Sequence, residues 1–149
     1  ILLIIASAAI FAWILTANQV ANHLGTFLLS LSTDKTVLLL IIMLLVLIIG
    51  MFMETIAAIT ILVPLLLPIA ATVGIDPVHL GIIVILNLMI GLLTPPVGMV
   101  LYVLSEVSGV KFEQCVKATM PFLVPLTIVL LLVTFFPQLA LWLPTMLYR

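Results

Sequence analysis

Apolar residues fill most of this chain, and its few charged side chains divide it into long uncharged runs. Residues 1–16, 36–53, 55–75, 77–105 and 118–148 contain no Asp, Glu, Lys or Arg. About 20 consecutive apolar residues are enough for a helix to cross the hydrocarbon core of a bilayer. The pattern therefore predicts an all-α integral membrane protein with transmembrane helices in these runs.

Residues 18–31 follow a different pattern, in which polar and apolar positions alternate with helical spacing. Val20, Leu24, Phe27, Leu28 and Leu31 fall on one side, and Asn18, Asn22, His23, Thr26 and Ser30 fall on the other. This pattern is typical of a helix that lies in the membrane interface. We interpret His23 as a solvated residue of its polar face and group residues 1–35 as a scaffold or arm unit.

Residues 110–119 predict a second amphipathic arm, which precedes the last membrane span. Phe112, Cys115, Val116 and Thr119 share one side of a helix, and Lys111, Gln114 and Lys117 share another. The span that follows, in residues 118–148, contains four prolines that are expected to kink or shorten it. Residues 110–149 thus form the last predicted unit.

Residues 36–75 predict a helical hairpin, the first part of a transport unit in residues 36–109. Glu54 separates two apolar runs, yet no Pro, Asn-Gly or Asp-Gly signal marks a surface turn between them. We therefore expect a re-entrant hairpin whose tip is buried in protein. Two interpretations of Glu54 remain open: a functional ionisable group at membrane depth, or an interfacial residue that caps a helix.

Residues 77–109 predict a second helix, interrupted between Gly91 and Gly98. Asp76 and Pro77 suit its N-cap and first position. Two consecutive prolines, Pro95 and Pro96, remove backbone donors, so the helix must break and leave carbonyl oxygens free. Such oxygens, together with the Thr94 hydroxyl, are ligands that suit a sodium ion.

Asn87 is the other strongly polar side chain within a predicted span. It either faces a ligand cavity or bonds a neighbouring helix.

Composition narrows the possible partners and cofactors. The chain is 66% hydrophobic and 6% charged, with a net charge of -1, which indicates a lipid environment and gives nucleic acid no basic surface to bind. With one cysteine and two separated histidines we expect no disulfide and no transition-metal site. The chain starts at Ile1 without an initiator Met or a signal sequence, so we expect it to be part of a longer polypeptide.

Four ordered segments carry a resemblance to a known family. They are residues 50–58 (GMFMETIAA), 62–68 (LVPLLLP), 74–81 (GIDPVHLG) and 87–98 (NLMIGLLTPPVG). Over about residues 4–144 the chain resembles the C-terminal half of the large permease subunit of tripartite ATP-independent periplasmic (TRAP) transporters. Several motifs in a fixed order are far more specific than any one of them.

The resemblance implies an elevator-type, sodium-coupled importer of organic acids, such as dicarboxylates or sialic acid, in a bacterial or archaeal inner membrane. It implies two partners, a small membrane subunit and a periplasmic substrate-binding protein, and no cofactor besides the coupling ion. It also implies an inverted second half, whose ion site this chain does not contain.

The resemblance also suggests which residues form the site. Gly50, Glu54, Thr55 and Ala57 would surround the hairpin tip, and Gly91, Thr94, Pro95, Pro96 and Gly98 would form the break, with sodium between them. Thr55, Asn87 and Thr94 are the candidates for substrate contact.

Three other functions compete with this one. A sodium-coupled dicarboxylate carrier of the same superfamily would share the architecture and need no binding protein. An intramembrane enzyme would have to use Glu54 or His79, but no H-E-x-x-H, paired Asp or Ser/His arrangement supports it, and His79 is expected at the interface. A structural membrane subunit would have no translocation path of its own.

Overall fold

The computed structural model describes residues 2–32 and 34–147, and within them the chain is helical without strands. The helices are α1 (Leu2–Ala17), α2 (Val20–Leu31), α3 (Lys35–Gly50), α4 (Thr55–Thr72), α5 (Pro77–Leu92), α6 (Met99–Ser108), α7 (Phe112–Phe135) and α8 (Pro137–Leu147). The predicted all-α class is confirmed. The hairpin corresponds to α3 and α4, and the interrupted helix corresponds to α5 and α6.

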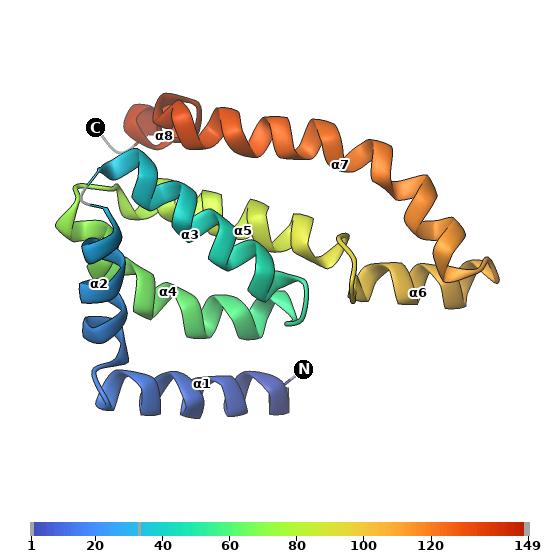
Figure 1. Cartoon of the computed structure of the whole chain (residues 1–149), viewed down its shortest axis with the longest axis horizontal. Helices are drawn as coiled ribbons and strands as arrows, with labels where there is room; N and C mark the ends of the chain where they lie inside the picture. The colour runs from blue at the N-terminus through green and yellow to red at the C-terminus, as the bar shows by residue number, and fades with distance from the viewer. Residues whose placement is uncertain (1, 33, 148–149) are drawn as a thin grey trace.

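Helix α5 is the centre of the packing. It contacts both arms of the hairpin, whereas α3 and α4 contact each other much less. Leu38, Ile42 and Val46 of α3 and Ile83 and Leu88 of α5 are all completely buried. Figure 1 shows α3 and α5 running in the same direction. Helix α4, which connects them in the sequence, runs in the opposite direction. The ends of α3 and α5 therefore lie at the same end of the bundle.

Acidic residues start three of these helices. The carboxylates of Asp34, Glu54 and Asp76 each accept hydrogen bonds from two backbone N–H groups in the first turn of α3, α4 and α5. Such a cap satisfies donors that would otherwise lack a partner, and its loss typically costs about 1 kcal/mol. Asp76 and Pro77 occupy the predicted N-cap and first helical positions.

At the open end of the hairpin, where α3 begins and α4 ends, one long side chain connects the two helices. The Lys35 ammonium group at the start of α3 donates to the Gly74 carbonyl oxygen after the end of α4, at 3.0 Å. This bond lies at the opposite end of the hairpin from the tip.

Helix α2 coincides with the amphipathic segment predicted in residues 18–31. It packs on α1 and α4, and Figure 1 shows it running across the direction of both. His23 is exposed, as expected for a residue of the polar face. An orientation across α1 and α4 is the one that an interfacial helix would have, whereas its position in a membrane remains a prediction.

Two helices are long and apolar enough to cross a membrane among the residues described, α4 and α7. Helices α3, α5 and α6 are apolar but shorter, as is the Ala6–Leu15 part of α1. Helix α1 has the length of the predicted segment 1–16. The other two apolar runs are divided as the sequence indicates: α3 ends at Gly50, where the hairpin tip begins, and residues 93–98 interrupt run 77–105 between α5 and α6.

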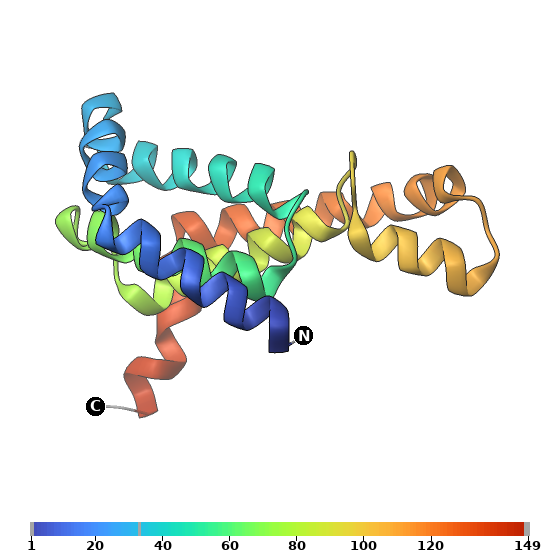
Figure 2. The ribbon, with the colours of Figure 1, turned by 90° about the horizontal axis from the view of Figure 1, so that it is seen from below.

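The predicted amphipathic arm and the start of the last span lie in one continuous helix, α7, although Pro121 and Pro125 lie inside it. Which part of α7 lies in the membrane stays a prediction. Figure 1 shows this helix bending along its length, so the prolines curve it without ending it. The interruption comes later, at Phe136, and Figure 2 shows α8 turning away from the direction of α7.

The apolar side of the predicted arm packs as the sequence indicates. Cys115 is buried, and the Phe112 ring stacks on Tyr102 of α6 with a centroid distance of 4.4 Å. These contacts join α6 to the start of α7.

His79 is buried within the protein, whereas its expected position at the membrane interface stays a prediction. Its side chain is 1% exposed, and its Nε2 atom is hydrogen-bonded to the Val133 carbonyl oxygen of α7 at 2.8 Å. Because α7 packs on α5, it covers this residue and supplies its polar partner. His79 thus has a structural role between two helices.

Candidate functional site

The hairpin tip and the helix break meet through two glycines. Gly50 is the last residue of α3, and Gly91 lies in the last turn of α5. A Cβ atom added to Gly91 would lie 2.7 Å from the carbonyl carbon of Gly50 and 2.9 Å from its Cα. A Cβ atom on Gly50 would lie 3.2 Å from the Cα of Leu88. The two backbones therefore touch directly, and only glycine fits at position 91 without movement.

The tip itself is a tight turn that ends in a cap. The backbone N–H groups of Phe52 and Met53 both donate to the Ile49 carbonyl oxygen, at 3.0 Å. Glu54 then adopts an extended conformation, and its Oε2 atom accepts from the backbone N–H groups of Ile56, at 2.9 Å, and Ala57, at 3.1 Å. Of the two interpretations of Glu54, the structure therefore shows the helix cap. Its role toward an ion stays a prediction.

Thr55 is the first residue of α4, and its hydroxyl group is buried without a hydrogen-bond partner. Its side chain is 7% exposed. A buried hydroxyl group without a partner is costly, and native structures rarely keep one without a reason. Thr55 therefore offers an unused oxygen at the hairpin tip.

The break between α5 and α6 comprises residues 93–98. The Thr94 backbone N–H donates to the Gly91 carbonyl oxygen at 3.0 Å, and the Thr94 hydroxyl group donates to the Ile90 carbonyl oxygen at 2.6 Å. The chain thus folds back on its own last turn, and the Leu93 backbone N–H also donates to the Gly91 oxygen. Which carbonyl oxygens of the break would bind an ion stays a prediction.

The far side of the break is set by Gly98, which has a φ of 57° and starts α6. A Cβ atom here would lie 2.9 Å from Leu101 Cδ1. Pro95 is half-buried and Pro96 is exposed.

Asn87 bonds a neighbouring helix. Its side-chain nitrogen donates to the Met43 carbonyl oxygen of α3, and its side-chain oxygen is buried without a partner. Thr134 of α7 also reaches Met43, where its hydroxyl group lies 3.2 Å from the sulfur. The sequence marked Asn87 as polar but gave no signal for its partner, because a backbone carbonyl is present at every position.

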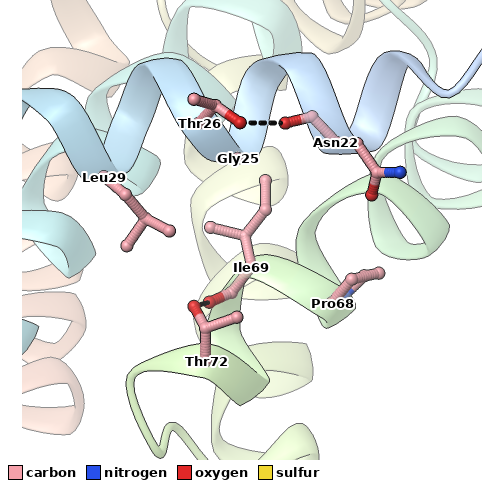
Figure 3. A pocket seen from close by; sticks show the side chains of 7 residues that line it. All are labelled: Asn22, Gly25, Thr26, Leu29, Pro68, Ile69 and Thr72. Atoms are coloured by element: carbon pink, nitrogen blue, oxygen red, sulfur yellow. Dashed lines mark hydrogen bonds between the residues drawn. The ribbon is translucent and has the colours of Figure 1, made fainter.

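Two pockets lie away from the predicted site residues. The first, of about 260 Å³, lies between α2 and α4 and is shown in Figure 3. Its lining consists of Asn22, Gly25, Thr26, Leu29, Pro68, Ile69 and Thr72. The second, of about 300 Å³, is apolar and lies among α5, α6 and α7. Neither contains a predicted site residue or a charged side chain, so neither is a candidate for binding an organic acid.

The cap role of Glu54 leads to a stability prediction. Glu54→Ala should lower the free energy of unfolding by about 1 kcal/mol, because two N–H groups of α4 lose their acceptor. Glu54→Gln keeps an oxygen in place and should retain most of the stability. Thermal unfolding in sodium-free buffer measures both. An equal loss in the two variants would show that charge, and not hydrogen bonding, stabilises the tip.

Known proteins are similar to this chain over most of its length. The model of the family described as "Tripartite ATP-independent periplasmic transporter, DctM component" matches residues 1–139. The sialic acid TRAP transporter large permease protein SiaM of Vibrio cholerae is 49% identical over 95% of this chain and 33% of its own length. The isethionate TRAP transporter permease protein DctMQ of Oleidesulfovibrio alaskensis is 47% identical over 92% of this chain and 22% of its own length.

A third relative is the C4-dicarboxylate TRAP transporter large permease protein DctM of Pseudomonas aeruginosa, which is 42% identical over 97% of this chain and 34% of its own length. The chain thus spans about a third or less of these relatives. Because the family model covers nearly all of the sequence, the chain belongs to the DctM family of large permease subunits of tripartite ATP-independent periplasmic transporters.

Proposed function

We propose that this chain forms one half of the translocation path of a sodium-coupled importer of organic acids. The transporter would work by an elevator mechanism in the inner membrane, as a multi-pass protein with a small membrane subunit and a periplasmic binding protein. Its relatives are named as permeases for sialic acid, isethionate and C4-dicarboxylates, which supports a small organic anion as the solute.

The observation that carries the proposal is the contact between Gly50 and Gly91. It brings the C-terminal ends of α3 and α5 together. The helix dipole makes the C-terminal end of each helix negative, also where the following turn supplies donors to its last carbonyl groups. Two such ends side by side favour a cation, which binds to oxygen ligands. We propose that sodium binds here, with the Thr55 hydroxyl group and nearby carbonyl oxygens as ligands.

Packing also supports movement of the hairpin with the interrupted helix. Helix α5 contacts α3 and α4 closely, so these three helices are suited to move together. We propose that they belong to the mobile unit of the elevator and that the hairpin is re-entrant. In this chain α1 and α2 pack on α4 as well, so the boundary at residue 35 remains a prediction.

The proposed sodium ligand can be tested with Thr55→Val, which keeps the shape of the side chain and removes its hydroxyl group. Uptake into proteoliposomes, by the complete large subunit with its proposed partners, should need about 10-fold more sodium, because a lost bond to a charged group is worth roughly 1.5–3 kcal/mol. Sialic acid, isethionate and a C4-dicarboxylate serve as test solutes.

Thr60→Val is the matched control, since the Thr60 hydroxyl group already donates to the Ile56 carbonyl oxygen of the same helix at 2.7 Å. This variant should keep the sodium dependence of the unmodified protein. Sodium-independent uptake by the unmodified protein would overturn the proposed function, and an unchanged response in Thr55→Val would remove Thr55 from the site.

A further inference from the structure

The contact between Gly50 and Gly91 is part of a longer seam between α3 and α5. Asn87 precedes Gly91 by one helical turn, and Met43 precedes Gly50 by two. The hydrogen bond from the Asn87 side chain to the Met43 carbonyl oxygen therefore lies along the same seam as the glycine contact. Figure 1 shows the two helices running in the same direction along it.

The remainder of this seam is apolar. Leu38, Ile42 and Val46 of α3 belong to the same buried cluster as Ile83 and Leu88 of α5. Close-packed apolar side chains resist displacement through their shape, whereas a buried amide bond also requires a defined distance and direction to its acceptor. The Asn87–Met43 bond therefore adds a directional contact that helps to hold α5 in place on α3.

Asn87 is not expected to be the residue type that gives the folded protein its highest stability at this position. Its side chain is 1% exposed, and its oxygen has no partner. A buried polar atom without a partner costs free energy, so an apolar side chain of similar size would fit this position at least as well. A buried polar residue that costs stability is best known for fixing register between helices.

We infer that Asn87 is a positioning residue, whose amide fixes the register of α5 on α3 and thereby aligns the Gly50–Gly91 contact at the sodium site. This inference rests on the proposed function. It replaces the expectation that Asn87 touches the substrate, since its bonded nitrogen points to α3.

The test measures sodium binding without a transported solute. The purified full-length large subunit is unfolded by heat while sodium chloride replaces choline chloride at constant ionic strength. A ligand that binds the folded state stabilises it by RT ln(1 + [L]/Kd), so the rise of the unfolding midpoint with sodium concentration yields an apparent Kd for sodium. The midpoint in choline alone reports stability.

Asn87→Leu should unfold in choline at the same temperature as the unmodified protein or higher, yet its sodium Kd should rise about 10- to 100-fold, as when the support of a metal ligand is removed. Thr134→Val is the matched control. It removes the other side-chain contact to Met43, from α7, and should leave the sodium Kd unchanged.

Asn87→Asp separates a positioning role from direct ligation. At acidic pH the introduced carboxyl group is protonated and can donate to the Met43 oxygen, so the sodium Kd should approach that of the unmodified protein. At alkaline pH it is ionised and cannot donate, so the Kd should rise. A direct ligand predicts the reverse, because an ionised carboxylate binds sodium better than a neutral acid.

The unmodified protein is measured at both pH values, so that any effect of pH that does not come from the introduced carboxyl group can be subtracted. A sodium Kd that is unchanged in Asn87→Leu, or tighter at alkaline pH in Asn87→Asp, would overturn the inference and leave the proposed function standing. Absence of any stabilisation of the unmodified protein by sodium would overturn both.

Discussion

Gly91→Ala should reduce sodium-driven uptake about 100-fold, the loss that a displacement of roughly 1 Å at a reacting site can cause. The added Cβ atom would lie 2.7 Å from the backbone carbonyl carbon of Gly50, and backbone cannot rotate out of the way as a side chain can. Helices α3 and α5 would have to separate, which typically costs about 1–3 kcal/mol. Transport assays and thermal unfolding of the full-length subunit measure the two effects.

Gly81→Ala is the matched control for this variant. Gly81 lies in the same helix, and a Cβ atom there meets nothing within 4 Å. This variant should transport normally and unfold at the same temperature or slightly higher, since alanine favours a helix. Normal sodium dependence in Gly91→Ala would show that the glycine contact is not part of the ion site.

Replacing both Pro95 and Pro96 by alanine should also abolish most uptake, again by about 100-fold. Alanine restores two backbone donors, so α5 can extend past Leu93 and redirect the chain before α6. The carbonyl oxygens near Gly91 would then be drawn into regular helical bonds. Uptake in proteoliposomes and surface expression of the variant separate loss of transport from loss of assembly.

The control is the same double replacement at Pro64 and Pro68, which lie inside α4 without interrupting it. That variant should keep its sodium dependence, because no break is removed. If the Pro95 and Pro96 variant transports with an unchanged sodium dependence, then the double proline is only a packing kink and the ion binds elsewhere.

The sequence was most informative where a local signal decides the structure. Asp76 and Pro77 start α5 as their residue types predict, and two adjacent prolines end it within a residue or two of the expected place. Glu54 shows the limit of such signals. A lone acidic residue between apolar runs suits a helix cap and a buried charge equally well, and only the positions of the Ile56 and Ala57 N–H groups show the cap.

Features that depend on a second helix could not be predicted. Nothing in the sequence shows that His79 is buried or that its partner is the Val133 carbonyl oxygen of α7. The continuity of α7 was hidden for a related reason. Pro121 and Pro125 are separated by one turn, so each removes one bond and bends the helix, whereas adjacent prolines break it. The spacing of Pro121 and Pro125 was thus the sequence signal that could have predicted a bent but continuous helix.

The cap at the hairpin tip also affects the order of binding. The first free N–H groups of a helix often bind anions, but at the start of α4 those of Ile56 and Ala57 are already bonded to the Glu54 carboxylate. These N–H groups are therefore not free for an anionic solute, and an ionised Glu54 carboxylate would repel a carboxylate or sulfonate. Under the proposed function, sodium has to bind first and cancel this repulsion. The solute would then bind at the tip only after the sodium ion.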